Sequence, residues 1–116
     1  MDADAALAEL TDLSAQIESA AVLDEDGAVL GSTPGSRGAE LARASSEALA
    51  TAAGLRPGAT PTRVELLLPG GGLFVVAEGR RRIAATTTPK PTAGLVVYDL
   101  RACLRRLAGE TGTAHA

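Results

Sequence analysis

The stretch RVELLLPGGGLFVVAEGRRRIAATTT, residues 63–88, decides the fold class of this 116-residue chain. It holds three short segments of apolar or Thr-rich character, at 63–68, 73–78 and 82–88, and glycine stands in each link between them. Links this short join neighbouring strands that run in opposite directions, because a parallel connection needs a much longer crossover. The stretch therefore predicts an antiparallel meander of three strands.

A hairpin is predicted upstream of the meander. SAAVLD at 19–24 and AVLGST at 28–33 flank a turn that contains Asp26-Gly27. An Asp-Gly pair between two short apolar runs favours a hairpin, because glycine accepts the positive φ that the turn requires. Neighbouring acids at 24–26 lack the further oxygen ligands of a calcium loop, so a solvated turn is the favoured interpretation.

Apolar residues at helical spacing predict helices at 3–17, 38–54 and 93–108. Asp2 or Asp4 can cap the first helix, and Gly54 suits the end of the second. The elements therefore follow in the order helix, two strands, helix, three strands, helix. This order, with hairpins in place of βαβ units, predicts an α+β fold layered around an antiparallel sheet.

The length predicts one domain, over residues 1–108, followed by a flexible polar tail at 109–116. The composition is unusual for the core of such a domain, because the chain has 24 alanines and 16 leucines but one Phe, one Tyr and no Trp. Such a core lacks large aromatic anchors. A small domain of this kind often gains stability by burying one face against a partner.

Several classes of function are excluded or disfavoured. The only cysteine is Cys103 and the only histidine is His115, which rules out an internal disulfide and makes a zinc site or a His-based triad very improbable. The single cysteine also favours a cytoplasmic location. No apolar run approaches the roughly 20 residues of a membrane span. A net charge of −3 gives no general reason to bind nucleic acid.

Charge is divided unevenly along the chain. Residues 1–60 carry ten acids and three bases, whereas residues 61–116 carry four acids and eight bases. The simplest interpretation is that the two halves fold together and offset one another. The alternative is that a basic patch, led by the three arginines at 80–82, meets an acidic partner.

The remaining motifs give no catalytic set. The loop GSTPGSRG at 31–38 lacks the Lys-Ser/Thr of a phosphate loop, and a flexible loop with Ser36 as a helix cap is favoured. Cys103 lies on an apolar helical stripe, which favours a buried thiol. No base is spaced to activate the threonines at 86–88. We therefore expect no catalytic residues, no metal and no cofactor.

Four phrases, taken in order, resemble the Roadblock family, the dynein light-chain-type domains with a profilin-like fold. They are AAVLDEDGAVLGS at 20–32, the Ala-rich second helix, GGLFVVAEG at 71–79 and PTAGLVVYDLRACLRRL at 91–107. The resemblance covers roughly residues 3–108. It implies a five-stranded antiparallel sheet in the order α-β-β-α-β-β-β-α, with the second helix on one face and the first and last helices on the other.

The resemblance also implies a function. Family members usually dimerise, with their second helices packed together and their third strands joined edge to edge. Prokaryotic relatives typically regulate small Ras-like GTPases, as activators or as platforms, and the Ala-, Gly- and Arg-rich composition is compatible with a GC-rich bacterial genome. The corresponding hypothesis is a non-catalytic homodimer that binds a small Ras-like GTPase.

On this hypothesis, the dimer contact is predicted at Leu41, Ala44, Ser45, Ala48, Ala52, Val64, Glu65, Leu66, Leu67 and Leu68. The GTPase-binding face is predicted at Glu40, Arg43 and Glu47, and Arg37 or Arg43 is a conceivable arginine finger. One alternative is a dimeric scaffold or sensory module that docks a kinase or another signalling partner without a GTPase. A small enzyme or ligand-binding domain is a further alternative, although the sequence offers little sign of a polar pocket.

Overall fold

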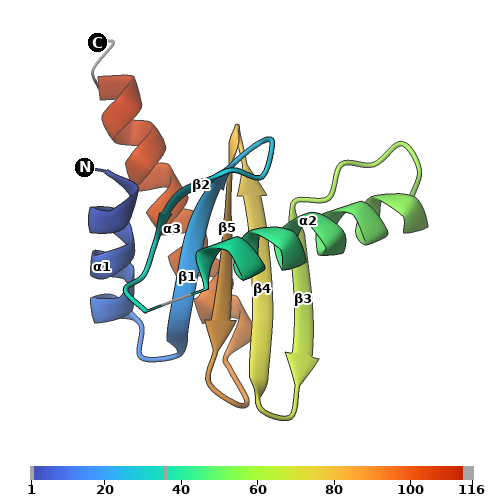
Figure 1. Ribbon diagram of the computed structural model, residues 1–116, viewed down its shortest axis with the longest axis horizontal. Coiled ribbons are helices and arrows are strands. Elements are labelled where there is room, and N and C mark those ends of the chain that lie inside the picture. Colours follow the sequence, from blue (N-terminus) through green and yellow to red (C-terminus); the bar gives the residue numbers. More distant parts are fainter. Residues whose placement is uncertain (1, 36, 114–116) are drawn as a thin grey trace.

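The computed structural model describes residues 2–35 and 37–113, so the predicted cap Ser36 and His115 lie outside the described residues. The elements follow the predicted order, as α1 (Ala3–Leu13), β1 (Ile17–Asp24), β2 (Val29–Ser32), α2 (Gly38–Leu55), β3 (Arg63–Leu68), β4 (Gly71–Glu78), β5 (Arg81–Thr87) and α3 (Ala93–Thr113). Figure 1 shows α2 crossing one face of the sheet while α1 and α3 cover the other.

The five strands form one antiparallel sheet in the order β2-β1-β5-β4-β3. The predicted hairpin and the predicted meander therefore join through β1 and β5, which pair along nearly their whole length. This arrangement confirms the predicted α+β fold and the predicted division of the helices between the two faces.

Strand β1 is buried on both faces because each face of the sheet carries a helical layer. Ala20 and Val22 belong to the cluster beneath α1 and α3, whereas Ala21 and Leu23 belong to the cluster beneath α2. Successive side chains of a strand point to opposite faces, which explains the alternation. Phe74 of β4, the only phenylalanine, is fully buried on the α1 and α3 side.

The hairpin turn between β1 and β2 is built by Asp24. One carboxylate oxygen of Asp24 accepts hydrogen bonds from the backbone N–H groups of Asp26 and Ala28, both at 2.9 Å. Gly27 has a φ of 89°, as the turn requires. Asp24 therefore orders the backbone of the turn, in agreement with the sequence interpretation of the acids at 24–26.

The outer edge of β2 is covered by the start of α1. Asp2 is the N-cap and accepts a 2.8 Å hydrogen bond from the N–H of Ala5, while Asp4 accepts one of 3.0 Å from the N–H of Ser32. A Cβ atom at Gly31 would lie only 2.7 Å from the side chain of Asp4. Glycine therefore allows β2 and α1 to approach this closely.

The prediction of a helix over 3–17 was wrong at its end, because α1 ends at Leu13 and β1 begins at Ile17. Ile17 is buried in the same cluster as Leu10, and it pairs with Thr87 of β5. Ile17 can be buried in this cluster from a strand as well as from a helix. The spacing of apolar residues therefore does not reveal where the helix ends.

Several other boundaries differ from the prediction, most of them by one or two residues. Strand β4 begins at Gly71 and not at residue 73, because Gly71 pairs with Leu68 across the turn. Helix α3 continues to Thr113, although a tail was predicted from residue 109. Glycine lowers helix propensity by only about 1 kcal/mol, so Gly109 does not end the helix. Residues 114–116 of the predicted tail lie outside the described residues.

An ion pair between α1 and α3 joins the acidic and basic halves of the sequence. Arg106 Nη1 of α3 lies 2.8 Å from Glu9 Oε1 of α1. In the patch at 80–82, Arg82 donates a 2.8 Å hydrogen bond to the backbone carbonyl of Glu25. None of the described helices has the length and hydrophobicity needed to span a bilayer.

Gly71 is predicted to be indispensable to the β4 and β5 pairing. Its φ is 141°, and a Cβ atom there would lie 2.1 Å from the backbone carbonyl oxygen of Thr87. We expect Gly71→Ala to lower the free energy of unfolding by about 3 kcal/mol, because backbone atoms of β5 must move. Gly70→Ala is the control, since a Cβ there meets nothing within 4 Å. Equal urea midpoints for the two variants would contradict the prediction.

Candidate protein-interaction site

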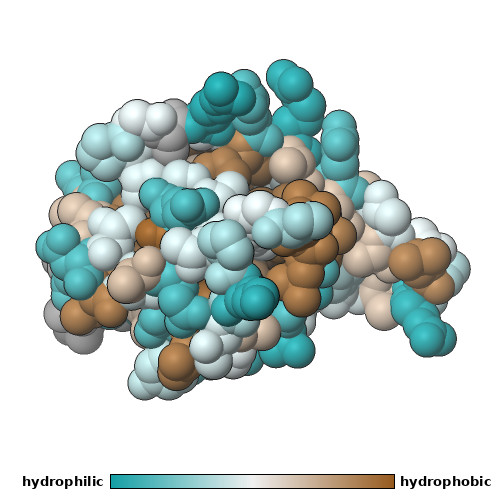
Figure 2. Space-filling view, turned by 90° about the horizontal axis from the view of Figure 1, so that it is seen from below, coloured by the Kyte–Doolittle hydropathy of each residue, from teal (hydrophilic) through white to brown (hydrophobic). Residues whose placement is uncertain are grey.

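A largely apolar groove lies between α2 and β3, on the α2 face of the sheet. Its volume is about 400 Å³, and its lining residues are Ala44, Glu47, Ala48, Thr51, Ala52, Leu55, Val64, Leu66 and Leu73. Figure 2, which views the molecule from below, shows hydrophobic surface gathered beneath the end of β3. The groove brings together the helix and the strand that the sequence predicted to form a dimer contact.

The groove exists because the helical side chains that line it are small. Ala44, Ala48 and Ala52 recur every four residues, so they share one side of α2. On β3, Val64 and Leu66 are two residues apart and therefore point to the same face of the sheet, toward α2. Alanines opposite leucines leave a shallow channel that the chain itself does not fill.

The strand beside the groove is an edge strand. β3 stands last in the strand order and, among the described residues, pairs only with β4, so the sheet they form does not use the backbone groups on its other side. Three consecutive leucines at 66–68 are exposed by 47%, 64% and 65%. Exposed leucines on an unpaired edge favour association with another chain.

The residues predicted for the dimer contact fall into two groups. Leu41 and Ser45 are buried against the sheet and so hold α2 in place. Ala44, Ala48, Ala52, Val64 and Leu66 line the groove, whereas Glu65 and Leu67 lie on the opposite face of β3. Leu68 is exposed at the end of the strand.

Three groove residues were missed from the sequence, namely Thr51, Leu55 and Leu73. Leu55 is 75% exposed at the end of α2. It stands seven residues after Ala48 and three after Ala52, so helical periodicity already placed it on the same side. Leu73 carried no such local signal, because its position depends on the pairing of β4 with β3.

The residues predicted to meet a partner lie along the exposed side of α2. Glu40, Arg43 and Glu47 are all exposed, and Glu47 also reaches the groove. Arg37 stands at the N-cap position of α2, where its Nη1 lies 3.3 Å from Glu40 Oε2. Both partners of that ion pair are largely exposed, so it contributes little to stability.

The chain was compared with known proteins. No protein-family model matches the sequence, and no curated protein matches it. Among solved structures, a Roadblock/LC7 domain from Streptomyces avermitilis has a TM-score of 0.81 at 19% identity, over 96% of this chain and 98% of its own. The chain has the fold of a Roadblock/LC7 domain.

Two further Roadblock-fold structures are similar. Myxococcus xanthus MglB has a TM-score of 0.77 at 16% identity, over 96% of this chain and 95% of its own. An MglB described with a tetrameric arrangement has a TM-score of 0.68 at 17% identity, over 90% of this chain and 83% of its own. Likeness at these identities shows the Roadblock fold, which is the fold that the sequence predicted.

In the described part of the chain, no three His, Cys, Asp or Glu residues lie close enough together to hold a metal ion. Cys103 of α3 is fully buried. Burial raises the pKa of its thiol above the ordinary value, and the positive charge of Arg106 offsets only part of that effect. The thiol is therefore protonated at neutral pH.

Cys103 is predicted to be unreactive while the protein is folded. The thiolate is the reactive form, and both burial and the raised pKa suppress it. We expect a thiol-specific chromogenic reagent to label Cys103 at neutral pH far more slowly in the native protein than in urea. Labelling at the same rate in both would show that the thiol is accessible in the fold.

Proposed function

We propose that this chain is a dimeric, non-catalytic regulator or platform that binds a small Ras-like GTPase in the cytoplasm. The observation that carries the proposal is the apolar groove beside the open edge of β3 in a domain of Roadblock fold. Roadblock domains, which the sequence resembles, typically use the second helix and the third strand to dimerise.

A second copy of the chain is the proposed occupant of the groove. Burying a leucine side chain contributes about 1.5–3 kcal/mol, and Leu55, Leu66 and Leu68 are all exposed in the single chain. Two β3 edges can pair antiparallel about a two-fold axis, which places each groove against the other copy's helix. The tetrameric arrangement of an MglB supports self-association in this fold.

The dimer is tested by Leu66→Glu. A carboxylate in the groove would have to be desolvated at the interface, so we expect the variant to be monomeric while the wild type is dimeric. Light scattering coupled to gel filtration measures the mass of each. Leu95→Glu is the control, because Leu95 is a 55% exposed leucine on α3, away from the groove. A monomeric wild type, or a monomeric Leu95→Glu, would contradict the proposed interface.

The proposed GTPase-binding surface is the exposed side of α2 at Glu40, Arg43 and Glu47. Glu47 also lines the groove, and Glu40 and Arg43 precede it on the exposed side of α2, so a dimer that packs α2 against α2 brings two such rows together. Charged rows of this kind steer and orient a partner, while each contact adds only modestly to the binding free energy. Binding and ordering a GTPase requires no nucleophile or general base on this chain.

We predict that the tagged protein retains a small GTPase from native lysate preferentially with either a GTP analogue or GDP. Charge reversal by Glu40→Lys together with Arg43→Glu is expected to weaken this capture without dissociating the dimer, because neither residue lines the groove. Recovery of a kinase or a paralogous partner in both nucleotide conditions, with no GTPase, would support the scaffold alternative instead.

The arginine-finger hypothesis is tested by hydrolysis. An arginine supplied in trans stabilises transition-state charge and accelerates hydrolysis by about 10³-fold or more. If Arg37 or Arg43 acts in this way, the corresponding Ala variant should bind the GTPase but lose most of the stimulation. If wild type, Arg37→Ala and Arg43→Ala all stimulate hydrolysis equally, the arginine finger is excluded. The remaining interpretation is a platform that orders the GTPase's own loops. No stimulation by the wild type would exclude an activating role.

A further inference from the structure

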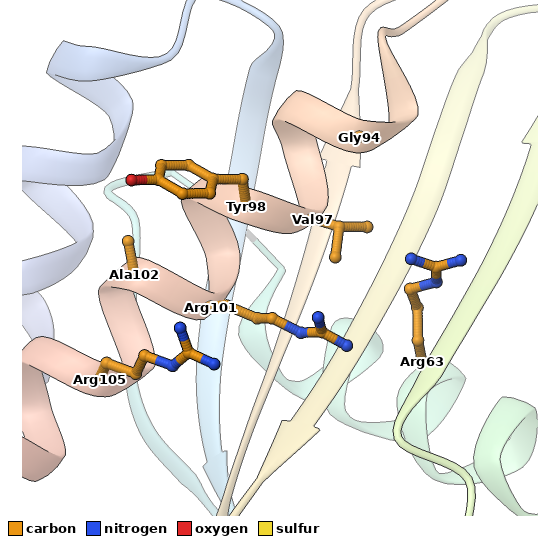
Figure 3. Close-up of a pocket in the computed structure, with 7 residues that line it drawn as sticks. All are labelled: Arg63, Gly94, Val97, Tyr98, Arg101, Ala102 and Arg105. Carbon is orange, nitrogen blue, oxygen red and sulfur yellow. The ribbon is translucent and has the colours of Figure 1, made fainter.

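A second hollow lies on the other face of the sheet, between α3 and the beginning of β3. Its volume is about 530 Å³, within the range of small-molecule sites. Three arginines line it, namely Arg101 and Arg105 from α3 and Arg63 from β3. Figure 3 shows Arg101 extending from α3 toward the strand that carries Arg63.

The fold places these arginines together although they are distant in sequence. Arg101 and Arg105 are four residues apart and so share one side of α3. Arg63 is the first residue of β3 and points to the α3 face, opposite to Val64. Val97 and Ala102 supply apolar lining, and Gly94 leaves open space where a side chain would project.

Two of the three guanidinium groups already have carboxylate partners. Arg63 Nε lies 3.0 Å from Glu65 Oε2, and Arg105 donates from Nε and Nη2 to Glu78 at 3.1–3.2 Å. These glutamates fix the positions of the two arginines at the rim of the hollow. They also neutralise two of the three positive charges.

Arg101 is different. It is half-buried, and within the described part of the chain it makes no hydrogen bond and no ion pair. Glu65 and Glu78 offset the charges of Arg63 and Arg105, whereas the charge of Arg101 has no carboxylate beside it among the described residues. One positive charge in this hollow is therefore uncompensated.

We propose that the hollow binds the phosphate group of a small phosphorylated metabolite, with Arg101 as the principal contact. The planar fork of arginine matches phosphate bidentately. A phosphate monoester presents three terminal oxygens, so Arg63 and Arg105 can donate to it while Arg101 is fully engaged. A carboxylate has only two oxygens and can be bound by one arginine, so a phosphate suits three arginines better. The organic part of the ligand would lie against Val97 and Ala102.

The test uses pyrophosphate as the probe and nuclear magnetic resonance as the readout. We expect titration into the ¹⁵N-labelled full chain to shift the amide signals of Gly94 and Ala102 and the Nε–H signal of Arg101, with saturation. Arg101→Gln should weaken binding by about tenfold or more, the effect of losing a charged hydrogen bond. Arg101→Lys, which keeps the charge but loses the fork, should also weaken it.

Arg56→Gln is the matched control, because Arg56 is an exposed arginine beyond the end of α2 and does not line the hollow. It should bind pyrophosphate as the wild type does. Saturating shifts that depend on Arg101 and not on Arg56 support the site. Absent shifts, or equal weakening by both Gln variants, would overturn it. Binding to vesicles of anionic phospholipid without any response to pyrophosphate would also overturn it, in favour of a membrane surface.

The outcome is separable from the proposed GTPase regulation. The hollow lies on the α3 face of the sheet, whereas the groove and the charged row of α2 lie on the other face. Gel filtration of Arg101→Gln should still give the wild-type mass. Because Arg101 has no hydrogen-bond or ion-pair partner among the described residues, its substitution should leave the dispersion of the amide spectrum unchanged.

Discussion

The whole arrangement depends on how closely two helical layers approach the centre of one sheet. In the register of β1 and β5, Ala20 is opposite Ala85 on one face and Ala21 is opposite Ala84 on the other, and all four are fully buried. Small side chains at the middle of both faces let larger neighbours fill the space beside them. Phe74, directly opposite Ala85 on β4, does this beneath α1 and α3.

The same constraint creates the candidate interaction site. On the α2 face the buried core ends with Leu41, Leu49 and Val75, and the outer strand adds to it the partly buried side chain of Val64. Helix α2 lies over the middle of the sheet, and its alanine side faces a strand whose leucines are half or more exposed. The core, built mainly of alanine, leucine and valine, covers the α1 and α3 face of the sheet. On the α2 face it leaves a groove beside β3.

Much of this was visible in the sequence. The bounds of β3 and the start of α2 matched the prediction, because Pro61, Pro69 and glycines mark them locally. Successive helical residues are rotated by about 100°, so the stripe through Leu41 and Ser45 faces the middle of the sheet while the alanine stripe faces the groove beside β3. The sequence prediction placed residues of both stripes in one dimer contact. The hollow formed by Arg63 and Arg101 was invisible, because no local pattern reports which strand packs beside which helix.

The two edges of the sheet differ in whether the chain covers them. Along β2 the chain closes its own border, since Asp4 accepts a hydrogen bond from the N–H of Ser32 and Gly31 lies against the start of α1. Along β3 nothing from the chain does the same within residues 2–35 and 37–113. Strand addition is therefore available on one side alone. Two copies that meet there use up both free borders, so growth by this route stops at a pair and cannot continue into a fibre.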